Sequence, residues 1–147
     1  MEINTKYHGT VNINNDDMIT FANGIPGFLD EKEFVIIPFS QGTPFQILQS
    51  VCSKDVAFTL IEPFSYFQDY TFELDSRTLD QLNIILEENV AIYNIITVHE
   101  PFTNTTVNLQ APIVINAEKR VGKQVILTNT SYHTKHNLFT QKQKLMK

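Results

Sequence analysis

The feature that most constrains the fold is a series of short strand-like runs along nearly the whole chain. Each run is rich in β-branched and aromatic residues, and turn-forming Gly, Pro, Asn, Asp and Ser separate many of them. Strands at this spacing, with no long helical periods between them, predict an all-β single domain, a small antiparallel barrel or sandwich with one or two short helices. The ten runs are 6–13, 18–22, 34–39, 45–51, 56–61, 70–74, 90–99, 106–109, 113–115 and 124–127.

Composition and length agree with this prediction. Val, Ile, Thr, Phe and Tyr make up 57 of the 147 residues, whereas Ala occurs five times. A chain of this length is the usual size of one domain and can bury a core without a metal or disulfide. We expect a β domain over residues 1–132 and a basic, polar C-terminal tail over residues 133–147.

One short helix is predicted after residue 74. Asp75 or Ser76 can cap its first turn, and Leu79, Leu82 and Leu86 share one face at helical spacing. Two or three turns fit before the next strand-like run. The helix is therefore expected to cover a barrel end or a sheet edge.

The charge is distributed unevenly along the chain. Residues 1–116 hold 15 acidic and 4 basic residues, whereas residues 117–147 hold 1 acidic and 7 basic residues. An acidic body repels nucleic-acid phosphates and favours basic partners, and a basic tail can dock on an acidic surface. No basic start followed by an apolar run and no long apolar span is visible, so we expect a cytoplasmic protein that does not bind membranes.

The sequence offers little catalytic chemistry. No phosphate-binding, dinucleotide-binding, zinc-protease or serine-hydrolase motif occurs, and a single cysteine, Cys52, excludes a disulfide within the chain. Cys52 is expected to be a small core residue, and the pair His133 and His136 to lie solvated in the tail. We therefore expect no catalytic residue, no cofactor and no metal site, and no enzyme activity.

Two segments are more specific than the rest. In the run 25–28, Pro26 presets φ and Gly27 supplies a positive φ, which predicts a type II turn. This turn either displays Ile25 and Phe28 to a partner or anchors Phe28 in the core, and the second interpretation is favoured. In the run 108–116, Pro112 predicts a break between two strands, with Asn108, Gln110 and Asn116 bonding to the backbone groups that the break exposes.

Taken together, these residues resemble the FliW family of bacterial flagellar assembly factors. The matching landmarks keep their order and spacing from about residue 20 to residue 136. They are Phe21 with the run 24–28, the run 108–116, the run 122–127, and Tyr132 with His136.

The resemblance implies a small β-barrel that acts as a protein partner switch. Such a protein binds flagellin in the cytoplasm and, when free, binds and antagonises CsrA, an RNA-binding repressor of flagellin translation. We expect a monomer on its own, with no direct nucleic-acid binding; the alternative is a nucleic-acid-binding β-barrel that uses the basic tail. The candidate protein-binding residues are Ile25, Pro26, Phe28, Asp30, Glu31, Glu33, Asn108, Gln110 and Pro112.

Overall fold

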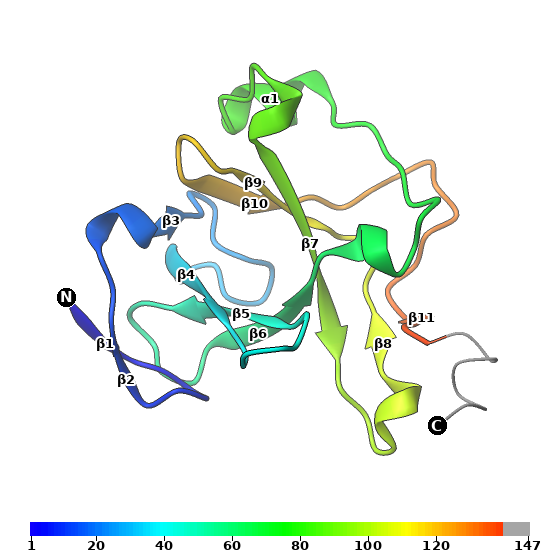
Figure 1. Cartoon of the computed structure of the whole chain (residues 1–147). Helices are drawn as coiled ribbons and strands as arrows, with labels where there is room; N and C mark the ends of the chain where they lie inside the picture. The colour runs from blue at the N-terminus through cyan, green and yellow to red at the C-terminus, as the bar shows by residue number, and fades with distance from the viewer. Residues whose placement is uncertain (140–147) are drawn as a thin grey trace.

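A closed seven-stranded β-barrel forms the body of the molecule in the computed structural model, which describes residues 1–139 (Figure 1). The order of strands around the ring is β3-β4-β5-β6-β7-β9-β10, and β10 returns to β3. All neighbours are antiparallel except β3 and β10, which are parallel. The strands are β3 (Ile19–Thr20), β4 (Glu33–Pro38), β5 (Gln46–Ser50), β6 (Ala57–Ile61), β7 (Val90–Thr97), β9 (Ile113–Asn116) and β10 (Val121–Gln124). The prediction of a mainly antiparallel, all-β domain is confirmed.

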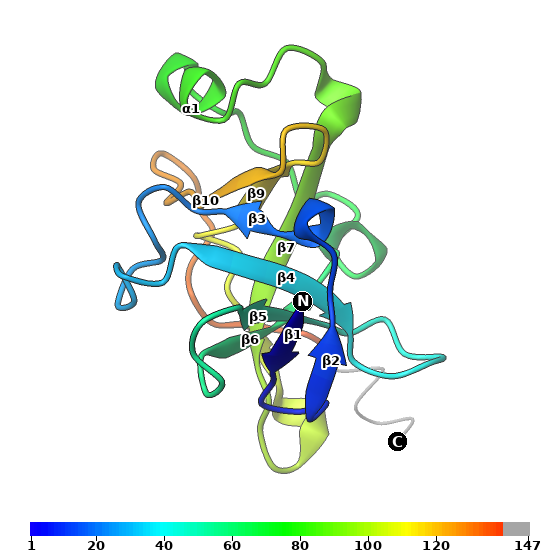
Figure 2. The ribbon, with the colours of Figure 1, turned by 90° about the vertical axis from the view of Figure 1, so that its left-hand side faces the viewer.

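Strand alternation builds two packed layers around β4. Phe34 points into the barrel, whereas the next residue, Val35, points to the outer face, because successive side chains of a strand lie on opposite sides. A hairpin of β1 (Glu2–Asn4) and β2 (Thr10–Asn12) covers that outer face, with Ile3 and Ile13 against Val35 (Figure 2).

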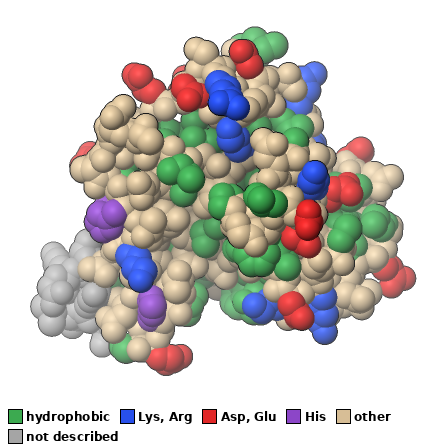
Figure 3. Space-filling view, turned by 180° about the vertical axis from the view of Figure 1, so that it is seen from behind, with side chains coloured by type: hydrophobic (Ala, Val, Ile, Leu, Met, Phe, Trp, Pro, Cys, Tyr) green, Lys and Arg blue, Asp and Glu red, His purple; other side chains and the backbone are tan. Residues whose placement is uncertain are grey.

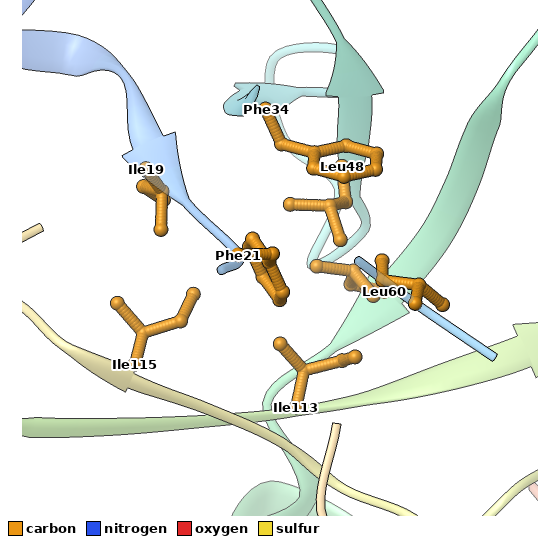
Figure 4. Close-up of a cluster of buried hydrophobic side chains, with 8 residues drawn as sticks. Ile19, Phe21, Phe34, Leu48, Leu60, Ile113 and Ile115 are labelled. Atoms are coloured by element: carbon orange, nitrogen blue, oxygen red, sulfur yellow. The ribbon is translucent and has the colours of Figure 1, made fainter. Parts of the chain in front are cut away.

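The barrel interior holds an aliphatic and aromatic core (Figure 4). Phe21 and Phe34 meet edge to face, with ring centroids 5.2 Å apart. Burial of this apolar surface is the main stabilising contribution to a fold of this size. The buried members of the core are Ile19, Phe21, Ile25, Phe34, Leu48, Leu60, Ile113 and Ile115.

A second cluster lies where the far half of β7 leaves the barrel. There β7 pairs with β8 (Thr106–Val107), and β8 pairs with β11 (His136–Asn137). The prediction of a tail from residue 133 is therefore wrong for residues 133–139, because β11 adds to the sheet and Leu138 is buried in the cluster with Val107. The remaining predicted tail, 140–147, lies outside the described residues.

Within residues 1–139 there is one α-helix, α1 (Ser76–Gln81), and it lies at one end of the barrel (Figure 1). Asp75 caps it by accepting a hydrogen bond from the Thr78 N–H at 2.8 Å, as predicted. Leu82 is buried just after the helix, whereas Leu86 is 51% exposed and does not share its packing. Four 3₁₀ turns complete the described chain: η1 (Asn15–Asp17), η2 (Pro63–Ser65), η3 (Glu87–Asn89) and η4 (Phe102–Asn104). No helix in residues 1–139 is long and apolar enough to cross a membrane.

Several predicted strand boundaries are wrong. The run 70–74 is not a strand, β1 and β11 were not predicted, and the last predicted run, 124–127, overlaps β10 only at Gln124. Residues 70–74 instead form part of the connection from η2 to α1.

Candidate protein-binding surfaces

The predicted turn at residues 25–28 is present. The Phe28 N–H donates to the Ile25 carbonyl at 2.6 Å, and Gly27 has a φ of 87°, as a type II turn requires at its third position. Ile25 is buried in the barrel core, so Ile25 is not displayed on the surface. Phe28 is 41% exposed and packs edge to face on Phe58 at 5.4 Å, which makes it a surface aromatic rather than a core anchor.

The surface at this turn is larger than the sequence prediction. Leu29, which was not predicted, is 65% exposed next to Phe28, and Pro26 is exposed as well. The exposed side chains of Phe28 and Leu29 give this turn a small apolar surface. Asp30 and Glu33 follow them and are also exposed.

Glu31 differs from its two acidic neighbours. Its carboxylate accepts hydrogen bonds from the Ser50 and Ser53 hydroxyls, the second at 2.8 Å. The Ser50 hydroxyl also accepts from the backbone N–H groups of Cys52 and Ser53. Glu31 therefore has a structural role in holding the turn between β5 and β6. A partner-binding role for Asp30, Glu31 and Glu33 stays a prediction.

The run 108–116 makes the predicted break between β8 and β9. The Asn108 Oδ1 accepts from the Gln110 and Ala111 N–H groups at 3.1 and 3.0 Å, which satisfies the backbone where the chain turns. Pro112 is buried, and no side-chain hydrogen bond of Gln110 is recorded among the described residues. The runs 25–28 and 108–116 meet inside the barrel, where Ile25 and Ile113 belong to the same hydrophobic core.

Asn116 connects this segment to the end of the barrel that carries α1. Its Nδ2 donates to the carbonyls of Leu82 and Asn83 at 2.9 and 3.1 Å, and its Oδ1 accepts from the N–H groups of Glu118 and Lys119. Asn116 thus satisfies four backbone groups at once, which confirms the prediction that its side chain bonds to the backbone.

A groove with no counterpart in the sequence predictions lies between α1, β7 and the connection that leads from η2 to α1. It has a volume of about 670 Å³, and most of its lining is apolar. Two carboxylates, Glu73 and Glu87, are part of the lining. The apolar side chains that line it are Phe64, Tyr70, Phe72, Leu74, Leu79, Ile84, Ile85, Val90 and Ile92.

A buried network anchors one wall of this groove. The Tyr70 hydroxyl donates to the Leu109 carbonyl at 2.7 Å and accepts from the Asn94 Nδ2 at 3.2 Å. Burial raises the pKa of Tyr70 to about 12, against the opposing effect of the Asn94 hydrogen bond, so the phenol stays protonated. The neighbouring Thr71 N–H donates to the Tyr132 hydroxyl at 3.0 Å.

Of the other polar residues singled out by sequence, Cys52 and His133 are exposed, whereas His136 is partly buried, so the prediction of a solvated pair is wrong for His136. Cys52 is exposed in the turn after β5 and not in the core, which corrects its prediction. The rings of His133 and His136 stack with centroids 3.7 Å apart, and burial, followed by the charge of His133, lowers the pKa of His136. Within residues 1–139, no group of three or more His, Cys, Asp and Glu side chains is arranged to hold a metal ion.

Comparison with known proteins gives consistent matches over nearly the whole chain. The family model described as FliW protein matches residues 2–138. A flagellar assembly factor FliW of Geobacillus sp. (strain WCH70) is 61% identical over 142 residues, which cover 97% of this chain and 98% of that protein. The flagellar assembly factor FliW of Bacillus subtilis (strain 168) is 48% identical over 136 residues, which cover 92% and 95%. A crystal structure of the flagellar assembly factor FliW superposes with a TM-score of 0.92 at 58% identity, over 97% of this chain and 99% of that chain.

Proposed function

Because this chain belongs to the FliW family of flagellar assembly factors, we propose that it acts in the cytoplasm as a protein partner switch. In this proposal the protein binds flagellin and, when flagellin is exported, the freed protein binds a CsrA-type translational regulator. That second complex relieves repression of flagellin synthesis. The protein works through binding alone, without catalysis and without direct contact with nucleic acid.

The observation that carries the proposal is the match to FliW proteins over almost the full chain, among them one that is 61% identical. Surface chemistry supports it. The first 116 residues hold 15 acidic and 4 basic residues, and the surface carries apolar patches at Phe28 and Leu29 and along the groove beside α1. An acidic surface with apolar patches suits a basic protein partner and repels RNA.

The switch follows from mass action. In this proposal the two partners cannot occupy the protein at the same time. Each partner that binds therefore lowers the concentration of free protein that is left for the other, and rising flagellin withdraws the protein from the regulator. Repression then returns when unexported flagellin accumulates. No conformational change in this protein is needed for that response.

Competition between purified components tests the proposal. Labelled regulator bound to the full chain is titrated with flagellin, and the bound fraction is followed by fluorescence anisotropy. We expect flagellin to release the regulator, and the protein alone to leave labelled RNA unbound. Failure to bind either flagellin or the regulator would contradict the proposal, and RNA binding by the protein alone would favour the nucleic-acid-binding alternative.

A further inference from the structure

We propose that the groove beside α1 is a docking site for an amphipathic segment of a partner protein, aliphatic along one face and flanked by Lys or Arg. This inference rests on the proposed function in one respect, that the chain works by binding proteins. It states which surface binds the partner and what chemistry the bound segment has.

The apolar surface extends beyond the groove onto its rim. Ile85 lines the groove and is 89% exposed, Leu86 follows it at 51%, and Phe64 on the opposite connection is 50% exposed. A small molecule held in the hollow would leave most of this rim in water. An occupant that covers both the hollow and the rim has the dimensions of a protein segment, and an amphipathic helix laid into an apolar groove is a common form of such binding.

The charge of the groove selects a basic occupant. Residues 62–90, which supply the lining up to the start of β7, contain seven acidic residues and one basic residue, Arg77. Glu73 and Glu87 line the groove, and neither takes part in an ion pair recorded within residues 1–139. The pKa of Asp75 is lowered mainly by hydrogen bonds from Thr78, and the nearby charges of Lys123 and Arg77 lower it further, so these two cations lie beside Asp75.

Figure 3 shows carboxylates and hydrophobic side chains close together at the end of the molecule that carries α1, with Lys and Arg side chains beside them; the described residues that line the groove itself include two Glu and no Lys or Arg. Carboxylates at the margin of an apolar surface pair with Lys or Arg on a partner and reject a partner with acidic margins. The groove therefore distinguishes between amphipathic segments by the sign of their flanking charges.

Hydrogen bonds within this chain hold the walls of the groove in place. Tyr70 is tied to Leu109, and Asn116 holds the carbonyls of Leu82 and Asn83 just after α1. A preformed groove spends little binding free energy on ordering itself. We accordingly expect the groove to bind without refolding.

The first test uses the full chain and two labelled helical peptides. Both carry Leu on one face; one has Lys at the margins of that face and the other has Glu at the same positions. We expect the Lys peptide to bind at least tenfold more tightly than the Glu peptide at low salt, and the difference to shrink as salt rises. Equal binding of the two peptides would overturn the inference.

Surface variants then locate the site. Ile85→Asp and Glu87→Lys are expected to weaken binding of the Lys peptide tenfold or more. The matched controls Ile126→Asp, at a residue that is 62% exposed away from the groove, and Asp55→Lys, in the turn after β5, are expected to leave it unchanged. Thermal melting of each variant checks the fold. Unchanged peptide binding in the two folded groove variants would overturn the inference.

The same variants separate this inference from the proposed function. If the parent protein binds flagellin or the regulator and both groove variants bind them as tightly, the groove inference fails and the partner switch stands. If the parent binds neither protein while peptide binding follows the groove variants, the partner switch fails and the groove inference stands.

Discussion

At position 27 a glycine is needed because of the backbone and not because of crowding. The φ of Gly27 is 87°, a region that side chains with a Cβ rarely adopt, yet a Cβ built there meets no atom within 4 Å. Gly24 also has a positive φ, 67°, and a Cβ there would in addition lie 2.5 Å from the carbonyl oxygen of Leu29. The backbone dihedral angle therefore favours glycine at both positions, and close approach of the chain adds a second constraint at Gly24.

Gly27→Val is expected to lower the free energy of unfolding by about 1–3 kcal/mol, because a β-branched residue is strained at positive φ. Gly27→Asn should lose less, since Asn tolerates this region. Chemical denaturation of the three proteins measures the difference. Equal stability of the Val and Gly proteins would contradict the assigned turn.

His136 is expected to make the stability of the fold decrease as the pH falls. Its pKa is lowered from 6.5, first by burial and then by the stacked His133, so the unfolded chain binds the proton more tightly than the folded chain. The neutral imidazole therefore contributes stability above pH 6.5, and that contribution is lost as the pH falls through 6.5 toward the folded pKa.

We expect the parent protein to lose more stability between pH 7.5 and pH 5.5 than His136→Gln does. Unfolding curves at the two pH values measure this, and His99→Gln, at an exposed histidine, serves as the control and should follow the parent. A parallel decrease in the parent and in His136→Gln would show that His136 does not contribute.

At the scale of elements, the helix cap was predictable and the strand pairing was not. Asp75 lies directly before an apolar run with helical spacing, and this local signal identified α1. The alternation Tyr70, Phe72, Leu74 equally predicted a strand, and those side chains do face inward or half inward. A strand also needs a neighbouring strand to pair with, and local sequence does not show whether one is present. Here the Thr71 N–H donates to the side-chain hydroxyl of Tyr132 and not to the backbone of another strand.

The groove was missed for the same reason. Its apolar lining comes from the connection before α1, from the residues after the helix and from β7, and only the folded chain brings these together. The local signal was present in Ile84, Ile85 and Leu86, three consecutive apolar residues next to two glutamates. Such a run is equally consistent with a buried strand, so sequence could not identify it as surface.

Asp75→Ala is expected to destabilise the end of the barrel that carries α1. The substitution removes the acceptor for the Thr78 N–H and so leaves the first turn of a six-residue helix without its cap. Hydrogen bonds from Thr78 lower the pKa of Asp75 below its ordinary value of 3.8. The stabilisation by the cap is therefore present at pH values above 3.8 and is lost as the pH falls through the pKa of the folded state.

Amide hydrogen exchange of residues 76–82, together with thermal melting, measures the effect of the lost cap. The control Asp80→Ala removes an equal charge from the same helix without removing the cap, and it should cost less than Asp75→Ala. Equal losses would attribute the effect to charge alone.

At the scale of the whole molecule, closure of the barrel depends on pairings between distant segments. β7 meets β9 in one half and β8 in the other, and β3 meets β10 across a hundred residues of chain. Sequence alternation predicts the individual strands but carries no information on which strands meet. The distribution of charge, by contrast, follows directly from the sequence, and it is the whole-molecule property on which the proposed antagonism depends.

Asp30 and Glu33 are the exposed carboxylates beside the turn at residues 25–28, whereas Glu31 accepts hydrogen bonds from Ser50 and Ser53. The double variant Asp30→Asn with Glu33→Gln therefore removes two charges and leaves that structural contact intact. If the acidic surface lies close to the RNA path of the bound regulator, its field opposes the RNA phosphates. We expect the double variant to antagonise RNA binding by the regulator roughly two- to fivefold less at low salt.

Salt distinguishes this charge effect from an effect of shape. The screening length falls from about 30 Å at 0.01 M to about 8 Å at 0.15 M, so the difference between the parent and the double variant should shrink over that range. RNA competition assays at both salt concentrations measure it, with Asp69→Asn and Glu100→Gln together as a control that removes the same charge outside the motif. A salt-independent difference, with regulator binding intact, would assign the antagonism to shape or to a change in the regulator itself.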